Sequence, residues 1–81
     1  MRFRTLTVMT RGTSQLYSDV HLTMHRSGLH GCVTAVVSVD SSSELLYHGR
    51  VIDVSINHDS IAFEVGPGVG VTRARYTFSE Q

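Results

Sequence analysis

The sequence has no lysine and no tryptophan, and it has only one cysteine and one proline among its 81 residues. A disulfide bridge within one chain is therefore excluded, and the single Cys32 fits a reducing compartment. All seven fixed positive charges are arginine guanidinium groups, planar forks that suit bidentate contact with carboxylate or phosphate. Codon usage in a GC-rich genome is the simplest cause of the missing lysine, but the chemical consequence is the same.

Charge and hydropathy exclude several classes of protein. Seven acidic residues balance the seven arginines, and this neutrality argues against a dedicated nonspecific DNA binder. No apolar run is long enough for a transmembrane helix. The first residues, Met1 to Thr5, are not followed by the apolar segment of a secretory signal. We expect a cytosolic protein, in the host cytosol if a phage encodes it.

The length predicts a single domain that covers residues 1–81. A core of this size contributes only about 3–5 kcal/mol of net stability. Contact with a partner or a second copy would therefore add usefully to stability, and a homodimer is one possibility.

The residue types favour strands over helices. Valine, isoleucine and threonine supply 22 residues, whereas alanine, lysine, glutamate and glutamine supply eight. A first strand is expected from Arg2 to Met9, with Leu6 and Val8 inward. A bulge near Arg4 would turn Phe3 inward as well.

The segment from Gln15 to His25 fits two periodicities. Val20, Leu22 and Met24 alternate as in a half-buried strand. Leu16, Val20 and Met24 also recur four residues apart, as in a short helix over residues 14–25. The strand is favoured because the surrounding segments are rich in strand formers.

The middle of the chain predicts two more strands. Cys32 to Val39 alternates clearly, and Glu44 to Ile56 is long, with an expected bend at Gly49. Before that bend, the residues expected to point inward are Leu45 and Tyr47. After it, they are Ile52, Val54 and Ile56.

The C-terminal third predicts a hairpin and a final strand. Asn57-His58-Asp59 forms a tight connection, and the glycine-rich residues 66–70 interrupt the sheet. The last strand is expected from Val71 to Phe78. The inward residues of the two strands are Ile61, Phe63, Val65, Ala74, Tyr76 and Phe78.

Five or six short strands with tight turns predict a mainly β fold, a small antiparallel barrel or strongly bent sheet. From Val33 to Val65, the order of a strand, a turn, a long glycine-bent strand, a hairpin and a strand resembles the SH3-like and Sm-like small barrels. Gly49 loosely matches the glycine of the Sm type. The RNA-binding loop residues of that type have no counterpart, so the resemblance implies a fold and no function.

Candidate catalytic and metal sites are weak. His21, His25, His30 and Cys32 are zinc-ligand types within twelve residues, but their spacing fits no closed structural site. His30 and Cys32 could share a strand face, yet nothing suggests the third group that nucleophilic catalysis needs. The glycine-rich residues 66–70 precede a strand and not a helix, so they predict a turn. We expect no metal, no cofactor and no enzymatic activity.

The arginines give the best candidate surface. Arg2 and Arg4 form one pair at alternate positions, and Arg73 and Arg75 form another. If a barrel closes through its first and last strands, the two pairs could form one outward patch, extended by Arg50. Such a patch would attract phosphate or an acidic protein. Ordinary surface charge is the competing explanation.

These observations predict a non-catalytic binding module that occupies the surface of a protein or nucleoprotein complex. A phage or mobile-element inhibitor of a host defence complex is one example. Contact would be made by the arginine patch or by an exposed strand edge. Two alternatives are a nucleic-acid-binding barrel with an arginine-lined face, and a structural subunit of a small oligomer or virion.

Overall fold

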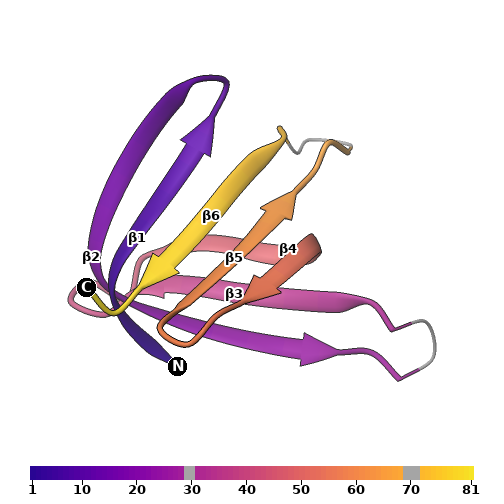
Figure 1. Ribbon diagram of the computed structural model, residues 1–81, viewed down its shortest axis with the longest axis horizontal. Coiled ribbons are helices and arrows are strands. Elements are labelled where there is room, and N and C mark those ends of the chain that lie inside the picture. The colour runs from indigo at the N-terminus through magenta and orange to yellow at the C-terminus, as the bar shows by residue number, and fades with distance from the viewer. Residues whose placement is uncertain (29–30, 69–71) are drawn as a thin grey trace.

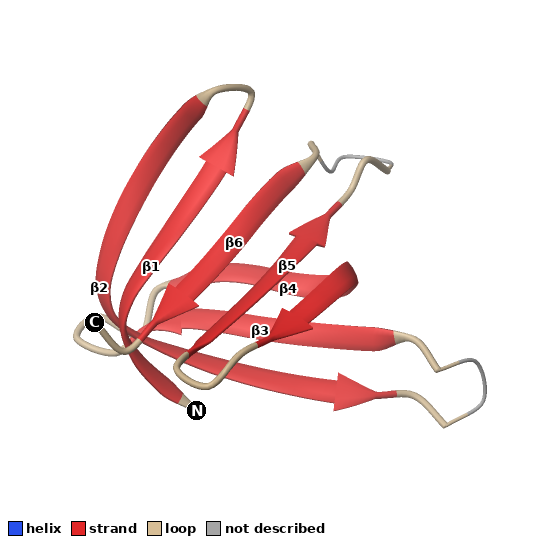
Figure 2. Cartoon of the chain, in the orientation of Figure 1, coloured by secondary structure: helices blue, strands red, loops and turns tan. Residues whose placement is uncertain are grey.

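The computed structural model describes residues 1–28, 31–68 and 72–81, and the regular structure in this part of the chain is entirely β-strand (Figures 1 and 2). The strands are β1 (Arg2–Thr10), β2 (Thr13–Arg26), β3 (Val33–Val39), β4 (Leu45–Ile56), β5 (Ser60–Val65) and β6 (Ala74–Ser79). The described residues contain no helix long and apolar enough to cross a membrane.

Each strand pairs with the next one in antiparallel orientation, and β1 pairs with β6 to close a barrel. The predicted small antiparallel barrel is therefore confirmed. Two strands change neighbours along their length. Residues 13–18 of β2 pair only with β1, while Val20–Arg26 pair with β3. The first half of β4 pairs with β3 and the second with β5, so two layers of strands cross in Figure 1.

The segment from Gln15 to His25 is a strand, and the alternative of a short helix is wrong. Val20 and Leu22 are fully buried and Tyr17 is half-buried, so the alternation changes phase between Tyr17 and Val20. Asp19 lies at that point with a φ of 54°. Opposite it in β1, Phe3 and Leu6 are both buried, so Phe3 lies inward as expected. The expected bulge near Arg4 is not found, because the register runs from Phe3–Val20 to Thr5–Ser18 without a shift, and both strands change phase together.

The core is built from inward residues of all six strands. Those of β5 and β6 were predicted correctly, as was the inward position of Leu6 in β1. Five aromatic rings form a continuous row through the barrel, with neighbouring centroids 5.2–5.6 Å apart: Phe3, Phe78, Phe63, Tyr76 and Tyr47. Such contacts add to the stability that burial of the rings already supplies.

The inward residues predicted for β4 are mostly wrong. Val51 is buried, whereas all four predicted aliphatic residues are exposed: Leu45, Ile52, Val54 and Ile56. The cause is two register shifts, one opposite Val37 and Ser38 and one between Ile52 and Ser55. The first brings Leu46 against the core in place of Leu45. The second contains Asp53, which has a φ of 51°.

Candidate binding surfaces

The two arginine pairs lie at opposite ends of the β1–β6 ladder, so the single arginine patch is wrong. Thr5 pairs with Ser79, and Met9 pairs with Arg75. A meander with an even number of strands closes with its first and last strands antiparallel. The beginning of β1, with Arg2 and Arg4, therefore lies beside the end of β6 and not beside its beginning.

Arg2 and Arg4 lie among carboxylates. Arg2 Nε is 3.8 Å from Asp40 Oδ2, and the side chain of Arg2 is largely exposed. The backbone N–H of Asp40 donates to the carbonyl oxygen of Asp19. The backbone N–H of Glu80 likewise donates to the carbonyl oxygen of Asp59. We call Asp19, Asp40, Asp59 and Glu80 the acidic rim, which offsets the charge of the first arginine pair.

The second arginine pair adjoins a depression of about 600 Å³ between the bend of β4 and the β5–β6 connection. Its lining includes Arg50 and Arg73, so two of the five predicted residues meet there. We call this depression the arginine groove. Its described lining residues are Tyr47, His48, Gly49, Arg50, Ile52, Gly66, Pro67, Gly68 and Arg73.

Two further arginines lie next to this groove. Arg11, Arg73 and Arg75 line an adjoining shallow depression together with Glu64. Arg75 Nη1 is 3.4 Å from Glu64 Oε1, an exposed ion pair of little energetic value. Four arginines therefore surround one end of the barrel. Arg11 was not predicted, because only the antiparallel pairing of β1 with β6 brings the β1–β2 turn beside Arg73.

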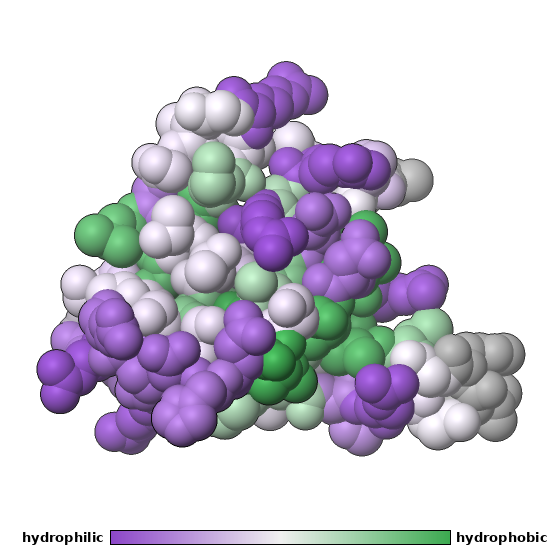
Figure 3. Space-filling view, viewed as in Figure 1, coloured by the Kyte–Doolittle hydropathy of each residue, from purple (hydrophilic) through white to green (hydrophobic). Residues whose placement is uncertain are grey.

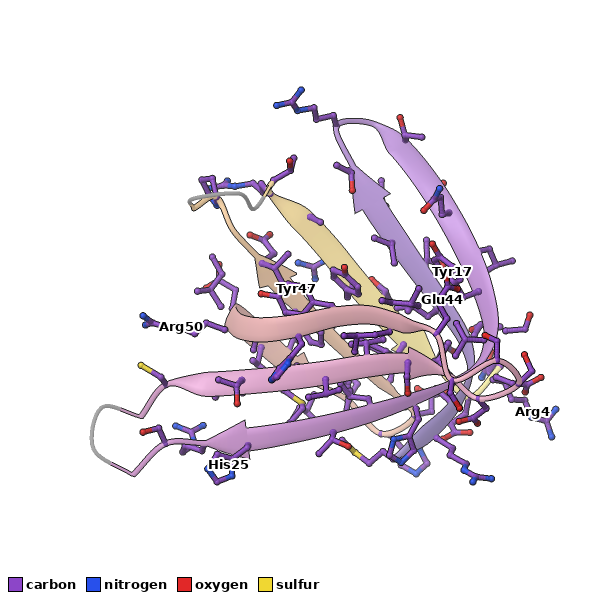
Figure 4. The ribbon with its side chains drawn as sticks, turned by 180° about the vertical axis from the view of Figure 1, so that it is seen from behind. Arg4, Tyr17, His25, Glu44, Tyr47 and Arg50 are labelled. Atoms are coloured by element: carbon purple, nitrogen blue, oxygen red, sulfur yellow. The ribbon has the colours of Figure 1, made fainter. Side chains whose placement is uncertain are left out.

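Tyr47 connects the groove to the core. Its ring centroid lies 5.6 Å from that of Tyr76, and its hydroxyl donates to the carbonyl oxygen of Arg50. Partial burial raises the pKa of the Tyr47 phenol above its usual value. Figure 4 shows Tyr47 beside β4, with Arg50 farther along the same strand and Arg4 at the opposite side of the molecule. The groove therefore presents a neutral aromatic ring beside guanidinium groups.

A second candidate surface lies at one end of the barrel, beside the C-terminal ends of β2 and β4. Val54 and Ile56 line a depression of about 220 Å³ together with Met24 and Val33. Ile56 pairs with Ile61, whose side chain is buried, so Ile56 points to the inner side of the sheet but remains 69% exposed. We call Met24, Val33, Val54 and Ile56 the apolar mouth.

The apolar mouth continues toward the N-terminus. Ile56 also lines a neighbouring depression of about 230 Å³ with Met1 and Phe3. Met1 is fixed there because its amino group donates to the carbonyl oxygen of Leu22 at 2.7 Å. Figure 3 shows hydrophobic surface in the lower middle of the molecule, between two hydrophilic areas. The sequence did not indicate this surface, because its residues were assigned to the core.

The candidate metal ligands do not form a cluster within the described ranges. His21 pairs with Ser38 and His25 with Thr34, on the outer side of β2. Cys32 immediately precedes β3, and its Sγ accepts from Arg50 Nη2 at 3.2 Å. His30 lies outside the described residues. Residues 1–28, 31–68 and 72–81 contain no group of three or more metal-ligand side chains that could hold an ion.

Comparisons with family models, with curated proteins and with solved structures gave no match. The chemistry of the surfaces is therefore the basis for inferring a function.

Proposed function

We propose that this protein is a non-catalytic binding module whose apolar mouth receives an apolar side chain of a protein partner. The observation that carries the proposal is the exposure of Val54 and Ile56 on the inner side of an open barrel end. Contiguous apolar surface of this kind marks interaction sites in small proteins. An inhibitor that covers the surface of a host complex is one form that such a module would take.

The lining of the mouth indicates the chemistry of the partner. Met24 offers an unbranched, adaptable thioether, which suits side chains of several shapes. His25 and Arg26 line the same depression, and Arg26 carries a fixed positive charge. The complementary segment is therefore an aliphatic or aromatic residue flanked by aspartate or glutamate.

Selection from a random peptide library tests this proposal without knowledge of the partner. We expect selected peptides to carry an apolar residue with acidic neighbours, and to shift the NMR signals of Met24, Val33, Val54 and Ile56. Ile56→Ser should weaken binding at least tenfold, about 1.4 kcal/mol. Leu45→Ser is the matched control, because Leu45 is likewise exposed, at 59%, but lies at the other end of β4, outside the apolar mouth. The proposal would be refuted if the peptides shift the NMR signals of other residues only, or if they bind the Ile56→Ser variant as tightly as the wild-type protein.

A second candidate function is binding of single-stranded nucleic acid in the arginine groove. The observation that favours it is the position of Tyr47 beside Arg50 and Arg73 in one depression. Bases stack on exposed aromatic rings, while arginines contact the phosphates. The nearby Gly66 and Gly68 leave backbone open to close approach.

The chain contains its own control for this second candidate. Replacing Arg50 and Arg73 with alanine removes two positive charges from the groove, and replacing Arg2 and Arg4 removes two positive charges beside the acidic rim. Affinity for a labelled oligonucleotide should fall steeply with salt in the wild-type protein. Only the groove variant should lose binding. Equal losses in both variants would indicate attraction by overall charge, and no binding at low salt would remove this candidate.

A further inference from the structure

The first half of β2 is a free sheet edge. Residues 13–18 pair with β1 on one side, and the pairing of β2 with β3 begins only at Val20. Among the described residues, no strand pairs with the other side of residues 13–18. All six side chains in this stretch except Tyr17 are exposed. The hairpin that contains them extends away from the crossing layers in Figure 1.

This edge lacks the features that usually prevent strand pairing between molecules. Natural edges carry charged residues or proline, which block addition of another strand. The six residues here are Thr13-Ser14-Gln15-Leu16-Tyr17-Ser18, without a charge or a proline. The adjacent outer face of the sheet is also uncharged in its central rows. One row is Leu16, Thr7, Thr77 and Ala62, and the other is Ser18, Thr5, Ser79 and Ser60.

The charges that border the edge are complementary to each other. Arg11 comes just before this stretch and Asp19 just after it, and both are exposed. In an antiparallel pair of two identical strands around a two-fold axis, the beginning of each strand lies beside the end of the other. With Leu16 opposite Leu16 of the other copy, Asp19 would lie opposite Thr13, two residues from Arg11, so the long Arg11 side chain would lie near the Asp19 carboxylate, while the uncharged residues 14–18 face one another.

We propose that two copies of this chain pair through residues 13–18 of β2, antiparallel around a two-fold axis near Leu16. The two sheets become one continuous sheet, and two Arg11–Asp19 ion pairs close its ends. A second copy is the occupant because the segment is complementary to itself in both charge and direction. This inference is independent of the proposed function, since the apolar mouth lies at a different part of β2.

The first test is sedimentation over a range of protein concentrations. We expect the wild-type protein to move from monomer to dimer as its concentration rises, because a six-residue strand pairing gives a small and reversible interface. Leu16→Lys should leave a monomer, since it places like charges opposite each other. Thr77→Lys is the matched control, because it adds the same charge to the same row of the sheet but away from the edge. Circular dichroism shows that each variant has folded.

The second test uses the symmetry of the interface. Leu16→Lys and Leu16→Glu should each be monomeric alone, and an equimolar mixture should form a mixed dimer, because opposite charges then meet across the axis. A wild-type monomer at the highest soluble concentration would overturn the proposal. A dimer that persists in Leu16→Lys, or that Thr77→Lys also abolishes, would place the interface elsewhere and equally overturn it.

Discussion

The ring of Tyr47 lies so close over Gly49 that a Cβ atom at residue 49 would be 2.8 Å from Tyr47 Oη and 3.2 Å from Cζ. The Tyr47 hydroxyl donates to the carbonyl oxygen of Arg50, the residue that follows Gly49. Because Gly49 has no side chain, the Tyr47 ring can pack directly against the bend of β4. This position fixes the aromatic wall of the arginine groove.

Replacing Gly49 with alanine should displace the Tyr47 ring and break its hydrogen bond to Arg50. The bond is worth about 1 kcal/mol, and the lower entropy of the unfolded variant returns about 0.4–1 kcal/mol, so stability should change by less than about 1 kcal/mol. The clearer effect is on titration. The pKa of Tyr47, which burial raises, should move back toward its usual value, as followed by NMR of the ring.

Tyr47→Phe is the control for this variant, because it removes the hydrogen bond and leaves the ring in place. It should keep the aromatic contact with Tyr76, 5.6 Å between centroids, which Gly49→Ala should lose. An unchanged Tyr47 pKa in Gly49→Ala would contradict the close packing described above.

The barrel should lose stability at alkaline pH through Tyr76. Burial raises the pKa of Tyr76, and the nearby Tyr47 and Tyr17 raise it further. A raised pKa in the folded state means that the unfolded chain ionises first. The contribution of neutral Tyr76 to the free energy of unfolding is therefore complete below about pH 10, and it is lost as the pH rises through the pKa of Tyr76 in the folded state.

Urea unfolding at several pH values between about 9 and 12 measures this loss. In Tyr76→Phe the free energy of unfolding should fall less over the same range, because the ionisable group is gone. Parallel pH profiles for the two proteins would mean that Tyr76 does not contribute.

Phe78 should be the side chain whose removal costs the most stability. It is fully buried, and its ring centroid lies 5.5 Å from those of both Phe3 and Phe63. Phe78→Ala should cost about 3–5 kcal/mol, which is as much as a core of this size supplies. We therefore expect an unfolded variant by circular dichroism at 25 °C.

Two milder variants show whether this effect is specific to the site. Phe78→Leu roughly conserves volume and should remain folded, with a cost below about 1.5 kcal/mol. Leu45→Ala should change stability by no more than about 0.5 kcal/mol, because Leu45 is exposed. A folded Phe78→Ala variant of nearly wild-type stability would contradict the central position of this ring.

The fold class could be predicted from the sequence because regular alternation carries it. In β5 and β6 the inward residues alternate without interruption from Ile61 to Val65 and from Ala74 to Phe78, and every one was predicted. Alternation failed where one strand slips relative to its neighbour. The shift near Asp53 depends on pairing with β5, so the sequence of β4 alone contains too little information to locate it.

The candidate surfaces depended on the same long-range information. Arg2, Arg4, Arg73 and Arg75 were each correctly placed at the surface, but whether two pairs meet depends on the direction of the closing strands. The apolar mouth was missed for a related reason. A β-branched residue at one end of a barrel has the same sequence signature as one in the core, because burial is decided by what the other strands cover.

Two neighbouring residues of β4 provide a direct test of this register. Val51 is 7% exposed and belongs to the core, whereas Ile52 is 44% exposed and lines the arginine groove. Simple alternation from Ile52 to Ile56 predicts the opposite. Val51→Ala should cost about 1–3 kcal/mol, the loss of buried methyl groups and the cavity they leave.

Ile52→Ala removes a larger side chain but should cost less than about 1 kcal/mol, because much of that side chain already contacts water. Chemical denaturation of the two variants under one set of conditions measures both values, and equal m-values would show that the unfolded states are comparable. If Ile52→Ala is the more destabilised variant, then Ile52 lies in the core and β4 alternates from Ile52 to Ile56 without the register shift near Asp53. The apolar mouth would then be part of the core and would not be available to a partner.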